Sequence, residues 1–237
     1  MARFEMASDR TFPTPALAEE RISAFLRSVY GWMCAGLAIT AAVAYFVASS
    51  PSIIQTLTRT PFVAIALMLA QLGLVGVLSI RVQRMAPSTA AALFIAYSAL
   101  TGVTVSFVLL TYTLQSVAST FAIASAMFGA MAFYGTVTSR SLAGWGQFLF
   151  MGLIGVILAS VVGMFWKSDG LQFVLAFCGV IVFTGLAAYD AQRLKAMALA
   201  LPSGATGSFA VVGALSLYLD FINLFLMLLR FTGDRRR

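Results

Sequence analysis

Phe209–Leu229 reads FAVVGALSLYLDFINLFLMLL, an apolar run with a single carboxylate, Asp220, near its centre. As an α-helix, a run of this length crosses about 30 Å of hydrocarbon at a rise of about 1.5 Å per residue. A charged Asp at the centre of such a helix costs at least about 2.5–3.5 kcal/mol, so it needs a partner, a water-filled cavity or a bound proton. The run therefore predicts a membrane-spanning helix whose carboxylate is turned away from lipid.

The polar residues of this run fall on one side of the predicted helix. Intervals of three or four residues separate the members of a polar stripe on a helix otherwise rich in Leu and Phe: Gly213, Ser216, Asp220 and Asn223. Such a stripe should face the interior of a bundle, with this last helix packed centrally. The pattern favours a functional role for Asp220, supported by Ser216 and Asn223, over a single structural hydrogen bond.

The rest of the chain repeats the apolar pattern. Of its 237 residues 61% are hydrophobic and 10% are charged, whereas soluble domains carry about a quarter charged residues, so the solvent must be lipid. Continuous runs favour helices over the alternating strands of a membrane barrel. We predict an all-α integral membrane protein, a seven-transmembrane-helix bundle with the last helix central. The other six predicted spans are Val29–Ala48, Pro61–Ile80, Thr89–Leu110, Val117–Val137, Gly146–Phe165 and Leu171–Tyr189.

Charged residues divide the chain into a polar cytoplasmic N-terminal tail (residues 1–24), a seven-helix transmembrane domain (25–230) and a basic C-terminal tail (231–237). The formal charge of +7 sits at the ends of apolar runs, which is typical of topology signals rather than of nucleic-acid binding. Counting basic residues by side places the N-terminus in the cytoplasm, with only Arg59 and Lys167 on the opposite side. Seven full spans would put the basic C-terminal tail outside, and the sequence leaves its side open.

Small residues at four-residue spacing mark one face of each of two predicted spans. In membranes such faces let helix backbones approach closely, so we expect both faces to be packed. They are Ala118, Ala122, Ala126 and Ala130 in the fourth span, and Gly155, Ala159 and Gly163 in the fifth.

The chain has no histidine, and its two cysteines, Cys34 and Cys178, fall inside apolar runs. This composition removes the usual ligands of haem and zinc, the usual base of acid–base catalysis and a disulfide framework. No cofactor is expected, and any movement of protons must use carboxylates, tyrosines or water.

Asp190 is the second carboxylate of interest, because it closes the sixth predicted span in the stretch AAYDAQR. Arg193 follows three residues later, and a surface ion pair at that spacing would explain Asp190 equally well. If Asp190 instead approaches Asp220, the two carboxylates cannot both ionise cheaply in a low-dielectric site and would share a proton. Helix packing would then respond to pH.

Residues 214–233, ALSLYLDFINLFLMLLRFTG, and 184–194, TGLAAYDAQRL, resemble the Bax inhibitor-1 family (transmembrane Bax inhibitor motif proteins) in its bacterial form. The likeness, with the seven-span layout, covers nearly the whole chain beyond the N-terminal tail. It implies a seven-helix bundle with the last helix central, multi-pass in the bacterial inner membrane.

The resemblance also implies a pH-sensitive calcium leak, gated by a hydrogen-bonded aspartate pair on the last two helices and an arginine on the second. By motif the pair is Asp190 and Asp220, and Arg81 is the best match for the arginine, with Arg84 left open. Some members carry an acidic residue within the second helix, where this chain has Gln71. Bacterial members are associated with the regulation of membrane proteases.

We therefore expect a pH-sensitive calcium leak through the lipid bilayer. High-affinity calcium sites use about six to eight oxygen ligands, so Asp190 and Asp220 offer only weak contacts to calcium, the transported ion. The alternative is an interaction protein that regulates a membrane protease, or a stress or cell-death response, by binding. An intramembrane aspartyl protease fits only in part, because Tyr189–Asp190 supplies the YD motif but YLDF replaces GxGD. No enzymatic activity is expected.

Overall fold

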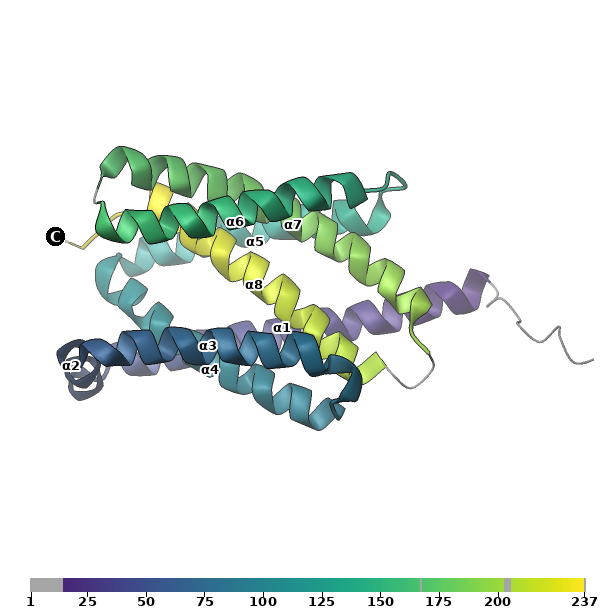
Figure 1. Ribbon diagram of the computed structural model, residues 1–237, viewed down its shortest axis with the longest axis horizontal. Helices are drawn as coiled ribbons and strands as arrows, with labels where there is room; N and C mark the ends of the chain where they lie inside the picture. The colour runs from purple at the N-terminus through teal and green to yellow at the C-terminus, as the bar shows by residue number, and fades with distance from the viewer. Residues whose placement is uncertain (1–14, 167, 203–205, 237) are drawn as a thin grey trace, which may run out of the picture.

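The computed structural model describes residues 15–166, 168–202 and 206–236, and helices make up nearly all of that part of the chain. Seven of them are long and apolar enough to cross a membrane, which confirms the predicted all-α seven-span bundle. In chain order the elements are α1 (Pro15–Ala48), α2 (Pro51–Arg59), α3 (Pro61–Arg81), the 3-10 turn η1 (Val82–Arg84), α4 (Pro87–Thr111), α5 (Leu114–Val137), α6 (Ala143–Phe165), α7 (Asp169–Ala200) and α8 (Thr206–Thr232) (Figure 1).

Local sequence signals explain where several helices begin. Proline, whose fixed φ suits the first helical turn, stands at the start of α2, α3 and α4. Thr113 and Ser168 cap α5 and α7, because their hydroxyls accept hydrogen bonds from the backbone N–H groups of Ser116 and Leu171. The helix α2 was not predicted, because its nine residues, PSIIQTLTR, are too short and too polar to register as a span.

The last helix lies at the centre of the bundle, as predicted. In its most apolar stretch 72% of residues are buried, against 6% in α3 at the edge. The helices α1, α4, α5 and α7 all pack against α8. Figure 1 shows α8 running diagonally between α1, α3 and α4 on one side and α5, α6 and α7 on the other. Its fully buried side chains include Leu217, Tyr218 and Leu224.

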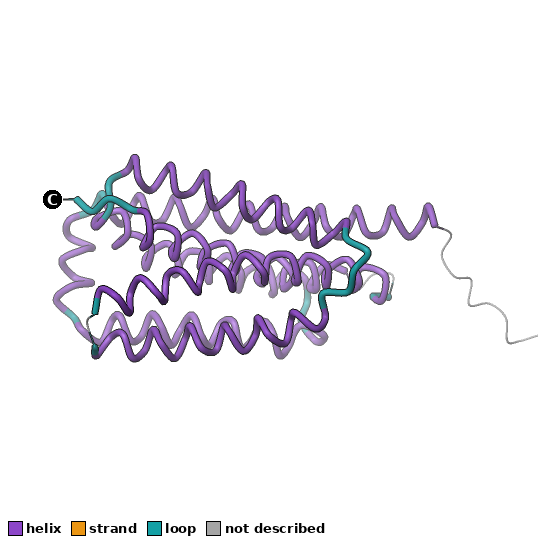
Figure 2. The backbone as a smooth tube through the Cα atoms, turned by 90° about the horizontal axis from the view of Figure 1, so that it is seen from above, coloured by secondary structure: helices purple, strands orange, loops and turns teal. Residues whose placement is uncertain are grey.

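The two ends of the described chain lie at opposite ends of the bundle. The start of α1, η1 and the α5–α6 loop share one end, and the C-terminal residues lie at the other (Figures 1 and 2). Here Arg235 pairs with Tyr112 in an isolated antiparallel bridge, and the backbone N–H of Thr113 donates to the carbonyl of Asp234 at 3.1 Å. Since α8 runs the length of the bundle, residues 233–236 lie at the end opposite the start of α1.

Two helices are longer than the sequence indicated. The predicted end of the sixth span at Tyr189 is wrong, because α7 continues to Ala200 through AQRLKAMALA, a stretch of strong helix formers. Asp190 therefore lies inside a helix rather than at its end. The helix α1 begins at Pro15, so residues 15–24 of the predicted polar tail are helical, and the start of this helix extends beyond the bundle (Figure 1). Residues 1–14, Lys167 and Arg237 lie outside the described residues.

The predicted small-residue face on α5 is also wrong. All four of its alanines are exposed, and the packed face carries Thr120, Ala124 and Phe128 instead. On α6 the prediction holds only in part, because Gly163 is buried but Gly155 is exposed, and a Cβ added at Gly155 would meet nothing. Alanine and glycine are frequent on lipid-facing surfaces too, so their spacing does not identify the packed side.

Candidate functional site

Asp190 of α7 and Asp220 of α8 line the same cavity, which has a volume of about 530 Å³ and lies between α6, α7 and α8. Asp220 is only 6% exposed, and Asp190 is half-buried. Arg193 lines this cavity as well. Asp190 therefore shares one cavity both with Arg193 and with Asp220.

The predicted polar stripe of α8 faces this cavity. Ser216, Asp220 and Asn223 all contribute to its wall. Asn223 donates a hydrogen bond through Nδ2 to the carbonyl of Leu219 on its own helix, at 2.8 Å. In contrast, Oδ2 of Asp220 is buried and has no hydrogen-bond partner among the described residues. The centre of the site is therefore one buried carboxylate oxygen that no neighbouring donor satisfies.

A second cavity continues from the first towards the end of the bundle where α1 begins. It has a volume of about 450 Å³, and Asp190, Arg193 and Ser216 line both cavities. Its far wall includes Val82 and Gln83 of η1. Asp190, Arg193 and Ser216 therefore lie between two cavities, one of which reaches η1 and the other Asp220.

Arg193 is the arginine that lines the cavity of Asp190 and Asp220. Arg81 and Arg84, the two arginines that the family resemblance implies, line a hollow of about 780 Å³ at the α3–α4 turn, and Gln83 lines both this hollow and the second aspartate cavity. Arg193 is brought in because α7 does not end at Tyr189, and residues three apart on a helix lie on the same side. The charged residues that line the two aspartate cavities are Asp190, Arg193 and Asp220.

The opposite side of α8 carries a buried hydrogen-bond chain that the sequence analysis missed. The hydroxyls of Tyr218 and Thr40 are hydrogen-bonded at 2.6 Å, and Thr40 Oγ1 donates to the carbonyl of Ser98 at 2.9 Å. Phe94 and Tyr97 of α4 pack edge-on against the Tyr218 ring. The helical period could have indicated this contact. Residues two places apart on a helix point about 200° away from each other, so Tyr218 must face a different helix from the one that Asp220 faces.

Gln71, the residue noted in the second span, is used structurally. Its amide Nε2 donates to Thr104 Oγ1 at 3.1 Å and lies 3.4 Å from Thr101 Oγ1, which links α3 to α4. Gln71 does not line either of the two aspartate cavities.

The arrangement suits proton sharing better than tight metal binding. The described residues contain no group of three or more His, Cys, Asp and Glu side chains that could hold a metal ion. A high-affinity calcium site uses about six to eight oxygen ligands, and two carboxylates supply too few. A proton that bridges the two carboxylates would satisfy Oδ2 of Asp220 and remove the repulsion between them.

Comparison with known proteins extends the resemblance to named relatives. A family model described as "Inhibitor of apoptosis-promoting Bax1" matches residues 22–237. "Inner membrane protein YbhL" of Escherichia coli strain K12 is 47% identical over 218 residues, which cover 91% of this chain and 93% of the relative. Uncharacterized proteins of Borreliella burgdorferi and Deinococcus radiodurans are 44% and 40% identical, over 90% and 91% of this chain and 92% and 93% of theirs. The match to the family model, residues 22–237, extends over positions 190 and 220 of this chain.

Proposed function

The chain belongs to the Bax inhibitor-1 family and is a multi-pass inner-membrane protein, and we propose that it is a pH-sensitive cation leak with calcium as the transported ion. The gate in this proposal is the pair Asp190 and Asp220. The observation that supports it is the buried, unpartnered Oδ2 of Asp220 in a cavity shared with a second carboxylate.

In the closed state of the proposed gate, one proton is shared between the two carboxylates. Arg193, in the same cavity, stabilises the remaining negative charge. Loss of the shared proton places two negative charges side by side in a low-dielectric site, where repulsion is strong. Asp190 and Asp220 sit on α7 and α8, which pack closely together at the centre of the bundle, so this repulsion acts directly on helix packing.

The same geometry supports a passive leak rather than a pump. The proposed path uses the two adjoining cavities, from Gln83 at the η1 end, past Asp190, to Asp220. Two carboxylates bind a divalent cation weakly, and weak binding lets an ion leave as easily as it enters. The proposal assigns the chain no enzymatic activity and no cofactor.

Calcium flux into dye-loaded proteoliposomes across a pH series tests the proposal. We expect flux with a steep pH dependence in the wild type, and a flat pH profile in Asp190→Asn and in Asp220→Asn. Asp169→Asn is the matched control, since Asp169 lies on the same helix as Asp190 but is exposed and lines neither cavity. An unchanged pH profile in Asp220→Asn would overturn the gating assignment, and a wild type without calcium flux would overturn the leak itself.

The second candidate remains an interaction protein that regulates a membrane protease or a stress response. It is favoured by the exposed start of α1, which extends beyond the bundle and presents Glu19 and Glu20. The C-terminal tail supports it less, because the backbone of residues 234–236 is hydrogen-bonded to the α4–α5 link. This candidate predicts a partner that co-purifies with Asp220→Asn but is lost from Glu19→Gln/Glu20→Gln, whereas retention of the partner by the double variant would exclude this surface.

A further inference from the structure

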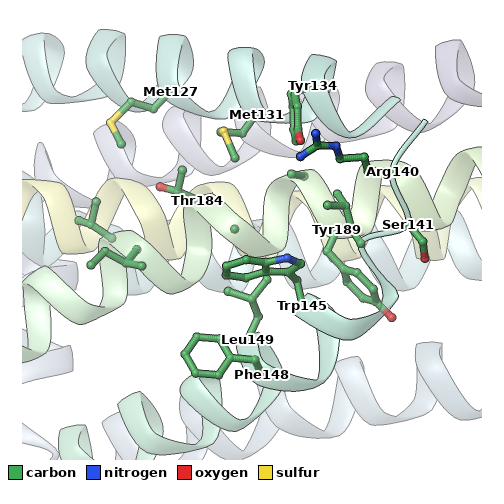
Figure 3. A pocket seen from close by; sticks show the side chains of 15 residues that line it. Met127, Met131, Tyr134, Arg140, Ser141, Trp145, Phe148, Leu149, Thr184 and Tyr189 are labelled. Atoms are coloured by element: carbon green, nitrogen blue, oxygen red, sulfur yellow. The ribbon is translucent and has the colours of Figure 1, made fainter. Parts of the chain in front are cut away.

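A further cavity, mainly apolar, lies on the side of α7 that faces away from the two aspartates. It has a volume of about 630 Å³ and forms a groove between α5 and α6, with α7 as its floor (Figure 3). We refer to it as the α5–α6 groove. Its walls include Met127, Met131 and Tyr134 of α5 and Trp145, Phe148 and Leu149 of α6.

The groove exists because α5 and α6 both pack on α7 but hardly on each other. Close approach of α5 to α7 depends on Gly135, where an added Cβ would collide with the backbone carbonyl of Ala188. The loop that joins α5 to α6 closes one end of the groove. Gln192 of α7 holds this loop, since its Oε1 accepts from the N–H of Leu142 at 2.8 Å and its Nε2 donates to the carbonyl of Arg140 at 2.9 Å.

The closed end of the groove differs in chemistry from the rest. Arg140 is the one charged residue among those that line it, and its side chain points from the loop towards Tyr134 (Figure 3). Trp145 and Tyr189 lie near this end, and amphipathic rings are typical of the headgroup level of a membrane. This is also the end that carries the start of α1, which the distribution of basic residues assigns to the cytoplasm.

From these observations we propose that the α5–α6 groove binds one anionic phospholipid of the cytoplasmic leaflet. The headgroup phosphate pairs with the Arg140 guanidinium. One acyl chain lies along the apolar floor and the methionine wall. Because the lining carries a positive charge and no carboxylate, a lipid with net negative charge is preferred over a zwitterionic one, by roughly fivefold for a single basic contact at the membrane surface.

Quenching of Trp145 by brominated lipids tests this assignment on the full chain. The other tryptophans are removed as Trp32→Phe and Trp166→Phe, and the protein is placed in phosphatidylcholine vesicles. These contain either phosphatidylglycerol or phosphatidylcholine brominated near the carboxyl end of the acyl chain. We expect half-maximal quenching at a roughly fivefold lower fraction of brominated phosphatidylglycerol than of brominated phosphatidylcholine. Arg140→Gln should reduce this to the phosphatidylcholine level, whereas Arg27→Gln, an exposed arginine at the same end, should not.

Equal quenching by the two lipids in the wild type, or an Arg140→Gln variant that keeps the preference, would overturn the proposal. A Phe148→Cys variant that forms a cross-linked dimer, together with a wild type that shows no quenching by lipid, would also overturn the proposal, because a helix of a second copy would then fill the groove. If the tryptophan substitutions prevent folding, native mass spectrometry of the otherwise unaltered chain makes the same comparison. Retained phosphatidylglycerol that is lost in Arg140→Gln supports the site, and equal retention contradicts it.

Discussion

Tyr218 and Asp220, two residues apart on α8, serve opposite halves of the bundle. The Tyr218 hydroxyl is fixed to Thr40 at 2.6 Å, whereas Asp220 faces the cavity that it shares with Asp190 and has an unsatisfied oxygen. The side of α8 that faces α1 thus makes a satisfied polar contact, whereas the side that faces α7 carries a carboxylate whose charge can change.

Tyr218→Phe should remove the hydrogen bond to Thr40 while keeping the buried ring. Hydrogen bonds between membrane helices contribute about 0.6 kcal/mol on average and up to about 1.7 kcal/mol, so we expect a loss of stability within that range. Chemical unfolding in detergent measures it. Tyr134→Phe is the control, because Tyr134 is exposed and none of the hydrogen bonds found in the described structure uses its hydroxyl. Equal stability of Tyr218→Phe and wild type would show that the contact contributes nothing.

Gly135→Ala should destabilise the bundle, because the new Cβ meets the backbone of Ala188, which cannot move aside as a flexible side chain can. Overpacking of this kind costs typically about 1–3 kcal/mol. Gly129→Ala on the same helix is the control, since a Cβ there meets nothing, and replacing glycine in a helix stabilises by about 0.4–1 kcal/mol. Thermal unfolding of both variants decides the matter, and a Gly135→Ala variant as stable as Gly129→Ala would contradict the close approach.

If Asp190 and Asp220 share a proton as proposed, the stability of the bundle should fall as pH rises and that proton is lost. Ionisation of both carboxylates puts two negative charges into one cavity beside a single arginine, Arg193. For one proton the free energy of unfolding changes by at most about 1.4 kcal/mol per pH unit. Asp220→Asn keeps the shape and removes one charge, so its melting temperature should vary less with pH and exceed that of the wild type at alkaline pH. Melting curves in detergent at several pH values test this prediction, with Asp169→Asn as the control. If the melting temperatures of Asp220→Asn and Asp169→Asn depend on pH in the same way, the aspartate pair is not the source of the pH dependence.

Gln192→Ala should free the loop that closes the α5–α6 groove. The substitution removes both hydrogen bonds between α7 and the backbone of Arg140 and Leu142. We expect faster trypsin cleavage after Arg140 in detergent-solubilised protein, because proteases cut mobile, exposed backbone. Gln55→Ala, on the exposed face of α2, should leave the cleavage rate unchanged. A rate that is the same in Gln192→Ala and wild type would mean that other contacts hold the loop.

The sequence was sufficient for the seven spans and for the position of the last helix, since both follow from free energies that dominate in lipid. Long apolar runs must be helices, and a helix with Asp220 on a stripe must turn that stripe inward. The orientation of Ser216 and Asn223 followed from helical period alone. These predictions depended on single helices and required no knowledge of neighbours.

Relationships between helices were harder to predict. Arg193 lies in the aspartate cavity because α7 continues past Tyr189, and that continuation depends on modest propensities that hydropathy does not weigh. The alanines of α5 face outward, and its packed face carries Thr120, Ala124 and Phe128, a difference that the four-residue spacing of small residues does not reveal. The Tyr218–Thr40 contact joins residues 178 positions apart, and no local pattern specifies such a pair.

The central position of α8 has a consequence for biosynthesis. The most buried helix is also the last to leave the ribosome, so the helices that surround it must enter the bilayer before their common core exists. Until residues 206–232 are inserted, the faces of α1, α4, α5 and α7 that will contact α8 have only lipid, the translocon or one another to cover them. The core of these seven helices therefore forms only with α8, and a chain truncated before residue 206 would lack the centre of the bundle rather than an edge.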